Sequence, residues 1–546
     1  MAATAVLHSP PPAAAPAPAL VQVAELRTRL AAPAEIAVVD VREEGVRARD
    51  GHILQSVPLP LGQIELRAGA LLPRRDVPLV VVDAGDGVLA RRAADRLAGL
   101  GYTDVSVLAG GVAAWVAAGG IAYTGSNVYS KAFGEFVEHA YGTPRLSARA
   151  LKDKLDAGED LVVLDGRTLQ EFETFSIPGA HAVPNAELPY RVHDLVRSES
   201  TLVVVNCAGR TRSIIGAQAL INAGIPNPVA ALENGTMAWL FEGFELNRGV
   251  SRAAPAPGAA GLDKARAAVA HLTQRFGIQA LDAAGLAALE AERARRSLYL
   301  LDVRTRAEYE AGHLPGSLWA EGGQLVQATD RWIGTRNARI VLIDDANGVR
   351  AAITASWLIQ LGIGEIHVFT LPADAQGLER GPEQAPVLGT PPAAATVSPA
   401  RLAELLAAGA VSVLDLDTSL AYGRGHVPGA RFAVRARLPE GLDTLPDLPL
   451  VLTSADGRLA AFAAAEAGAT GRSVSVLEGG TQAWAAAGLP LETGESALLH
   501  TADDVWRSPY QEAGDRHAAF RRYLDWEIDL IHQIEKDDTV SFKVYA

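Results

Sequence analysis

One pattern of residues recurs four times along this chain of 546 residues. Each copy contains an apolar run that ends in Asp, then a charged turn, then a Gly-His or Pro-Gly step. The aspartates are Asp40, Asp165, Asp302 and Asp415. They are much further apart than the roughly 20–50 residues of a solenoid repeat, so each copy is long enough to form a domain. The repeat therefore predicts four tandem domains instead of one large core.

A second apolar run follows in every copy, and the four runs are LVVVDAGDG, LVVVNCAGR, IVLIDDANG and LVLTSADGR. An Ala/Leu-rich helical segment and another short strand come next. Continuous apolar strands that alternate with helices are typical of α/β domains whose parallel sheet is covered on both faces. We therefore expect three-layer α/β/α domains with mainly parallel central sheets. Ligands of such sheets bind at the carboxyl ends of the strands.

The repeats and the stretches between them predict a domain organisation. We expect a flexible leader at 1–19, domain 1 at 20–124, a linker at 125–145, domain 2 at 146–248, a linker at 249–277, domain 3 at 278–392, domain 4 at 397–496 and a C-terminal helical tail at 497–546. The leader has no Lys or Arg before an apolar stretch, so we do not expect a signal peptide. No run approaches roughly 18 uninterrupted apolar residues, so we expect no membrane span.

The composition argues against several classes of partner. The net charge of −14 argues against nucleic acid, because phosphate binding needs a basic face. The single cysteine excludes an intrachain disulfide and a multi-cysteine zinc site, and it favours a reducing cytoplasm. No motif indicates a metal, a nucleotide or a flavin, so we expect no metal site and no cofactor.

The single cysteine, Cys207, follows the apolar run of domain 2 and opens a loop that leads into a helical segment. Backbone N–H groups and the helix dipole make such a loop a site for anions. Two arginines beside the thiol predict a lowered pKa and a partly ionised thiolate. The predicted substrate-binding residues are Ala208, Gly209, Arg210, Thr211, Arg212, Ser213 and, at the mouth of the pocket, Arg191.

These assignments leave alternatives open. Arg210 and Arg212 could be solvated surface charges, and Arg212 is the better candidate for an anion contact because it is nearer the helix start. A surface or ion-pair role for Arg191 is equally compatible with the sequence. Aligning the second runs places Ala84, Asp345 and Ala455 opposite Cys207, and none of these residues is a sulfur nucleophile. Domains 1, 3 and 4 are therefore expected to be inactive and to serve as scaffold, regulatory or docking domains.

The order of these features resembles the rhodanese family. The resemblance rests on Asp-x-Arg after the first strand, the Gly-His-x-Pro-Gly turn, the loop after the central strand and Gly-Gly-x-x-x-Trp near the end, and it covers about residues 20 to 495. It implies a sulfurtransferase in which Cys207 takes sulfane sulfur from thiosulfate or a related anion as a persulfide. A thiol, cyanide or a protein cysteine would then accept the sulfur. Asp165 and Arg167 recur in domains that have no cysteine, which favours a structural ion pair.

The sequence leaves two other functions open. A dual-specificity-type cysteine phosphatase or arsenate reductase has Cys, five residues and then Arg, whereas Ser213 stands at that position here. The shorter loop favours sulfur over the larger phosphoryl group. Alternatively, the four domains form a docking platform in which Cys207 is a persulfide carrier or sensor with little turnover.

Overall fold

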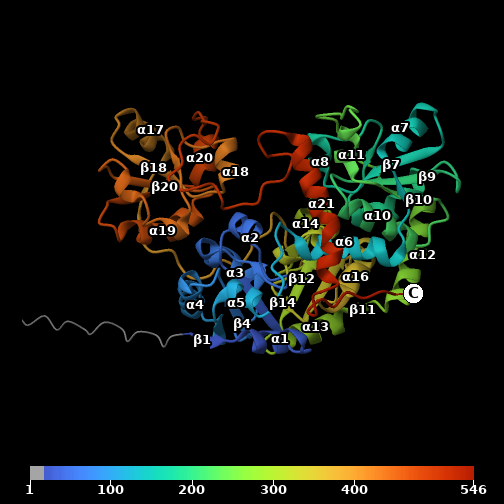
Figure 1. Cartoon of the computed structure of the whole chain (residues 1–546), viewed down its shortest axis with the longest axis horizontal. Helices are drawn as coiled ribbons and strands as arrows, with labels where there is room; N and C mark the ends of the chain where they lie inside the picture. Colours follow the sequence, from blue (N-terminus) through green and yellow to red (C-terminus); the bar gives the residue numbers. More distant parts are fainter. Residues whose placement is uncertain (1–17, 546) are drawn as a thin grey trace, which may run out of the picture.

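The computed structural model describes residues 18–545, which form four α/β domains in sequence order (Figure 1). The predicted leader at 1–19 therefore lies almost wholly outside the described residues. Each domain has a parallel sheet with helices on both faces, as predicted. No helix within residues 18–545 has the length and apolar character needed to cross a membrane.

Domain 1 is built on the sheet order β1-β5-β4-β2, with β3 also paired to β2. Its strands are β1 (Ala19–Val21), β2 (Ile36–Asp40), β3 (Val57–Pro58), β4 (Leu79–Val82) and β5 (Val105–Leu108). Its helices are α1 (Val23–Ala31), α2 (Glu44–Asp50), η1 (Leu61–Gln63), α3 (Ile64–Leu71), α4 (Val88–Gly99) and α5 (Gly111–Ala117).

Domain 2 has the order β6-β10-β9-β7-β8. Its strands are β6 (Arg145–Leu146), β7 (Leu161–Asp165), β8 (His181–Ala182), β9 (Leu202–Asn206) and β10 (Val229–Leu232). Its helices are α7 (Ala148–Asp156), α8 (Leu169–Thr174), η2 (Asn185–Glu187), α9 (Leu188–Arg191), η3 (Val192–Asp194), α10 (Thr211–Asn222) and α11 (Gly235–Phe241). The apolar run LVVVN becomes β9, the central strand, because both of its faces are covered.

Domain 3 has the order β11-β16-β15-β12-β13. Its strands are β11 (Gln279–Leu281), β12 (Leu298–Asp302), β13 (Leu318–Trp319), β15 (Ala338–Asp344) and β16 (Gly364–Thr370). Its helices are α13 (Ala283–Ala291), α14 (Arg306–Ala311), α15 (Gly322–Gln327), η4 (Thr329–Arg331) and α16 (Val349–Leu361). A further short strand, β14 (Thr335–Arg336), leaves this domain and pairs antiparallel with β2 of domain 1.

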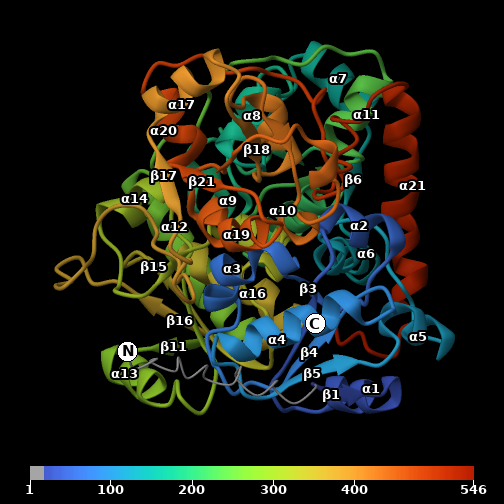
Figure 2. The ribbon, with the colours of Figure 1, turned by 90° about the vertical axis from the view of Figure 1, so that its left-hand side faces the viewer.

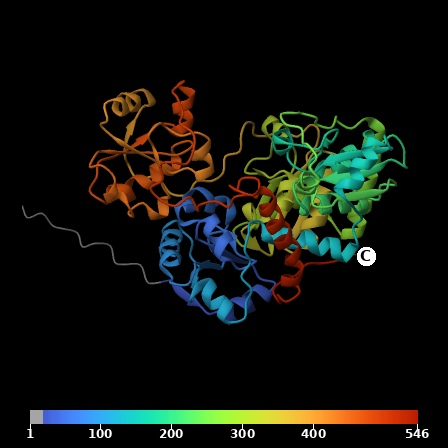
Figure 3. The same cartoon turned by 45° about the horizontal axis from the view of Figure 1, so that its top comes forward.

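Domain 4 has the order β17-β21-β20-β18-β19. Its strands are β17 (Ala395–Val397), β18 (Ser412–Asp415), β19 (Arg431–Phe432), β20 (Leu450–Thr453) and β21 (Val474–Leu477). Its helices are α17 (Pro399–Ala407), α18 (Ser419–Arg424), η5 (Arg435–Arg437), η6 (Leu442–Thr444), α19 (Arg458–Gly468) and α20 (Gly480–Ala486). Figure 3 shows the extended connection by which the chain reaches this domain from domain 3.

The segments outside the four sheets are largely helical. The predicted linkers contain α6 (Val128–Tyr141) and α12 (Ala259–Phe276), and the tail contains α21 (Arg516–Ile534). Helix α6 packs on both α10 and α21, which brings the tail against domain 2 (Figure 1). The linker sequence therefore forms part of the surroundings of the Cys207 loop.

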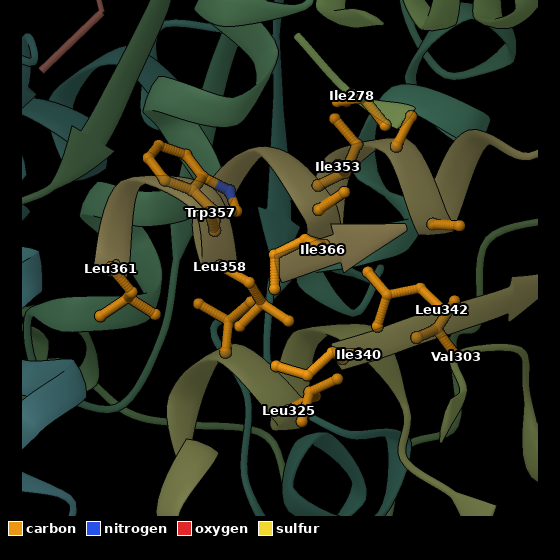
Figure 4. Close-up of a cluster of buried hydrophobic side chains, with 14 of the residues drawn as sticks. Ile278, Val303, Leu325, Ile340, Leu342, Ile353, Trp357, Leu358, Leu361 and Ile366 are labelled. Atoms are coloured by element: carbon orange, nitrogen blue, oxygen red, sulfur yellow. The ribbon is translucent and has the colours of Figure 1, made fainter. Parts of the chain in front are cut away.

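The domains pair two by two through their hydrophobic cores. One cluster joins Phe133 of α6 and Ile214 of domain 2 to Ile340, Leu342 and Trp357 of domain 3, and the domain 3 part is drawn in Figure 4. A second cluster joins domains 1 and 4, where α19 lies close to α3 (Figure 2). Burial of these apolar contacts is the main force holding the domains together.

Candidate active site

Cys207 is the first residue after β9 and lies beside the N-terminus of α10. Its side chain is 2% exposed. The Oγ of Ser213, the third residue of α10, donates a hydrogen bond to the Cys207 Sγ at 2.9 Å. The free N–H groups at the start of a helix and the helix dipole favour negative charge at this place. The thiol is thus positioned where a thiolate or persulfide would be stabilised.

The register of the strands corrects the alignment of the four domains. The residues opposite the four repeat aspartates in the neighbouring strand are Val82, Asn206, Ile343 and Thr453. The next residues are therefore equivalent, and they are Asp83, Cys207, Asp344 and Ser454. The predicted equivalents Ala84, Asp345 and Ala455 are wrong by one residue. None of the corrected positions has a thiol, so the prediction of a unique sulfur nucleophile is unchanged.

The error arises because identical letters do not guarantee an identical register. Leu79 of LVVVD faces Ala37, three residues before the repeat aspartate, whereas Leu202 of LVVVN faces Leu161, four residues before it. The apolar letters are interchangeable in sequence, and only the ladder of hydrogen bonds distinguishes them.

In domains 1 and 3, an aspartate stands at the position equivalent to Cys207, and a backbone N–H of the following helix binds its carboxylate. In domain 1, Ala90 N–H donates to the Asp83 carboxylate at 3.1 Å, and in domain 3, Ala351 N–H donates to the Asp344 carboxylate at 2.9 Å. Ala90 and Ala351 are each the third residue of the following helix, as Ser213 is in domain 2. In domains 1 and 3 the N–H of the third helical residue thus binds a carboxylate oxygen at this position, and in domain 2 the same position is occupied by the sulfur of Cys207.

The turn before α11 packs against the backbone of the Cys207 loop and hydrogen-bonds to it. Thr236 N–H donates to the Cys207 carbonyl at 2.9 Å. Asn234 and Gly235 both have positive φ, and a Cβ on Gly235 would lie 2.3 Å from the same carbonyl. The Asn-Gly step of the repeat is thus required by a close approach of two backbone segments.

Arg212 is the predicted cation that lies near the thiol. Its guanidinium binds both oxygens of Glu171 at 2.7 Å and acts to lower the pKa of Cys207. Burial would raise the pKa of Glu171, but Arg212, together with Arg167 and the Thr168 N–H, more than offsets it, and that pKa falls to about 2. In domain 3, Arg350 pairs with Glu308 at 2.7 Å in the absence of any thiol. The Arg212–Glu171 pair is therefore also part of the framework of the domain.

Arg210 and Arg191 bind carboxylates of the protein. Arg210 forms ion pairs with Glu135 at 2.7 Å and Glu138 at 2.6 Å, both on α6. Its backbone belongs to the loop, but its charge is neutralised by the linker helix. Arg191 binds Glu187 at 2.5 Å and the carbonyl of Pro255, away from the cavity beside Cys207. The sequence predicted an anion contact for these two side chains, and the geometry gives them structural partners.

The pKa of Cys207 is raised, and the predicted lowering is wrong. Burial raises it most, Arg212 and Ser213 oppose this, and Glu527 raises it further. The predicted loop is present, but other parts of the chain cover it and remove water from the thiol. The sequence around Cys207 gives no sign of this coverage.

The tail covers the loop through specific contacts. The Tyr510 Oη donates to the Ala208 carbonyl at 3.2 Å and is 2.7 Å from the Thr236 Oγ1. Thr211 Oγ1 donates a short hydrogen bond to the carboxylate of Glu527 on α21. The tail is therefore part of the immediate surroundings of Cys207, a role that the sequence alone did not predict.

A buried lysine attaches the tail to α6. The Nζ of Lys131 lies 4.7 to 5.0 Å from the ring centroids of Trp506, Tyr523 and Trp526. Burial lowers the pKa of Lys131 to about 8. Cation–π contacts of this kind are worth more when water is excluded. The many aromatic residues of the tail were the one sequence signal that could have indicated such packing.

Cys207 opens onto a cavity of about 770 Å³ that three parts of the chain line. Domain 2 contributes the Cys207 loop and Arg167, which forms the recurring ion pair with Asp165 at 2.8 Å. Domain 3 contributes residues around α15, and the tail contributes Trp506 and Tyr510 among others. Among residues 18–545, no cluster of His, Cys, Asp and Glu side chains has the grouping needed to hold a metal ion.

The fold and the repeat place the chain in a known class. Its residues 22–118, 147–242, 285–371 and 398–487 match the rhodanese-like domain family. These segments make up more than half of the chain, which therefore belongs to this family.

Individual proteins extend the comparison. The chain is 46% identical to a thiosulfate sulfurtransferase from Pseudomonas aeruginosa, with 97% of this chain and 100% of that chain covered and a TM-score of 0.91. It is 29% identical over 119 residues to the putative sulfur carrier protein YrkF of Bacillus subtilis; the aligned stretch covers 20% of this chain and 63% of that protein. It is 37% identical over 89 residues to the uncharacterized protein YibN of Escherichia coli; the aligned stretch covers 16% of this chain and 61% of that protein. The chain thus spans less than two thirds of these two curated relatives.

Proposed function

We propose that the protein is a sulfurtransferase that moves sulfane sulfur from thiosulfate to a thiol or cyanide through a persulfide on Cys207. The observation that carries the proposal is the position of the thiol. Cys207 stands at the helix N-terminus where domains 1 and 3 hold the carboxylates of Asp83 and Asp344. The similarity to a thiosulfate sulfurtransferase over nearly the whole chain supports the same conclusion.

In the first step, the sulfur of Cys207 attacks the outer sulfur of thiosulfate. A new S–S bond forms, the S–S bond of thiosulfate breaks, and its electron pair leaves with sulfite. The attacking species is the thiolate, so Cys207 first releases its proton, which burial makes harder, and the departing sulfite takes up a proton as hydrogen sulfite. The resulting persulfide anion remains beside Arg212 and Ser213, which stabilise negative charge.

In the second step, an acceptor thiol attacks the outer sulfur of the persulfide. The acceptor sulfur forms the new S–S bond, the bond to Cys207 breaks, and the acceptor proton returns to Cys207. No other cysteine exists in the chain to form a disulfide with Cys207, so the acceptor comes from outside. A reducing cytoplasm, where small thiols are abundant, is the compartment that fits this chemistry.

A persulfide carrier with little turnover is the second candidate, favoured by the similarity of one stretch to a putative sulfur carrier protein. The loop still argues against a phosphatase, because Arg212 comes one residue earlier than the phosphatase pattern requires and is bound to Glu171.

The test measures the intact mass of the protein after thiosulfate exposure and its turnover with cyanide in one experiment. After exposure to thiosulfate, the protein should gain one sulfur, about 32 Da, and the Cys207→Ser variant should not. Repeated cycles with cyanide should release thiocyanate. Loading without repeated cycles would favour the carrier, and full activity of Cys207→Ser would refute both.

A further inference from the structure

The cavity beside Cys207 is much larger than the proposed donor requires. A thiosulfate ion fills on the order of 100 Å³, on a scale of roughly 30 Å³ for each water-sized group. The cavity holds about 770 Å³, which is in the range of sites for whole metabolites. Most of it is therefore available to a second molecule, and the walls contributed by domain 3 have no part in the chemistry described above.

Three polar side chains of domain 3 line this cavity. They are Glu321, Gln324 and Gln327, whose side chains are half-buried, and each also has one polar atom that is fully buried and has no hydrogen-bond partner among residues 18–545. They are spaced by three residues at the start and along α15, so they lie on one face of the helix. A row of one carboxylate and two amides on a cavity wall offers both hydrogen-bond donors and acceptors to a polar ligand.

The position of α15 is fixed by its packing on domain 2. A Cβ on Gly323 would lie 3.1 Å from the Asn185 backbone nitrogen, and one on Gly322 would lie 2.9 Å from the Ala186 side chain. Cys207, Arg212 and Glu321 all line the same cavity. The polar face of α15 and the reactive sulfur thus share one cavity across the interface of domains 2 and 3.

We propose that the α15 face, formed by Glu321, Gln324 and Gln327, is the acceptor subsite and binds a small thiol that carries peptide-type amide and amino groups. The inference rests on the sulfurtransferase function proposed above. The carboxylate and one amide oxygen accept N–H groups of the acceptor, and an amide N–H donates to its carbonyl or carboxylate oxygen. The domain without a nucleophile would then select the acceptor, while domain 2 performs the transfer.

The burial of Cys207 favours a small acceptor over the surface of a folded protein. The thiol is 2% exposed and lies below the tail residues Tyr510 and Tyr523. A cysteine on a folded surface extends too little beyond its backbone to enter such a cavity, whereas a free peptide thiol can. Trp319 and Trp332, which also line the cavity, provide apolar surface for its methylene groups.

The experiment compares two acceptors in thiosulfate-dependent turnover: glutathione, which has amide, amino and carboxylate groups, and 2-mercaptoethanol, which has none of them. In the double variant Gln324→Leu/Gln327→Leu, the ratio of kcat/KM for glutathione to kcat/KM for 2-mercaptoethanol should fall about tenfold, since each hydrogen bond contributes a factor of about three or more. The matched control is Gln170→Leu, on the exposed side of α8, which does not line the cavity. It should leave the ratio as in the wild type.

A second variant tests the inference independently, in case the double variant does not fold. Glu321→Gln changes one atom, should also lower the ratio, and should remove an ionisation near neutral pH from the glutathione profile, because burial raises the pKa of Glu321 to about 7. A ratio within twofold of wild type in both variants, with circular dichroism unchanged, would overturn the inference. If the wild type itself takes up no sulfur from thiosulfate, the proposed function has failed instead.

Discussion

Removal of the Ser213 hydroxyl should raise the pKa of Cys207 and slow its reaction with thiosulfate. In Ser213→Ala the hydrogen bond of 2.9 Å to Sγ is lost, while the backbone N–H of residue 213 remains. A hydrogen bond to a charged group contributes about 1.5–3 kcal/mol. Taking the lower value, at about 1.4 kcal/mol for each pKa unit, the thiol pKa should rise by about one unit.

The effect on rate follows from two opposing factors. Below the pKa, a rise of about one unit lowers the thiolate fraction about tenfold. The more basic thiolate is about threefold more nucleophilic, with a Brønsted coefficient of about 0.4–0.5, so loading with sulfur should slow about three- to fourfold. Well above the pKa, the variant should react at least as fast as the wild type.

Alkylation by iodoacetamide between about pH 6 and 11 measures the pKa directly, because Cys207 is the only thiol in the chain. Mass spectrometry of sulfur loading measures the rate. The matched control is Ser356→Ala, which removes a buried hydroxyl from the corresponding helix of domain 3 that donates to the Ile353 carbonyl. A thiol pKa that is unchanged or lower in Ser213→Ala would refute the assigned role of this hydroxyl.

Two further predictions follow from the comparison of the four domains. Cys207→Asp should still fold cooperatively and lose all transfer activity, because domains 1 and 3 already hold Asp83 and Asp344 at this position; a variant that does not fold would contradict the equivalence. Asp415→Asn should stabilise the protein by about 2–3 kcal/mol at pH 7 in denaturant titrations, because Asp415 is buried opposite Asp417 instead of the arginine of the other domains, and burial raises its pKa to about 6. The folded state binds this proton more tightly than the unfolded one, so the carboxyl favours folding below about pH 4 and loses that contribution as the pH rises through 6. The benefit of the variant should accordingly vanish in acid.

Much of the site could be predicted because it is local. The order of strand, loop and helix follows from apolar runs and from the helical segment after Ser213, and the thiol position follows from both. The residues equivalent to Cys207 in the other domains could not be assigned correctly from the sequence. The choice between Ala84 and Asp83, for example, depends only on the register of the strands. Register depends on which residues of β2 and β4 face each other, and apolar letters alone do not specify this.

The sequence by itself determined the four α/β domains, the single cysteine and the strand, loop and helix around it, because these depend on short-range patterns of apolar residues, glycine and helix starts. Only the tertiary structure decided the electrostatics of the site. Glu135 takes the charge of Arg210, Glu527 and the rest of the tail bury the thiol and raise its pKa, and domain 3 supplies the α15 face. Each of these effects acts through distances of a few ångströms between segments that lie tens or hundreds of residues apart, and no local pattern encodes such distances.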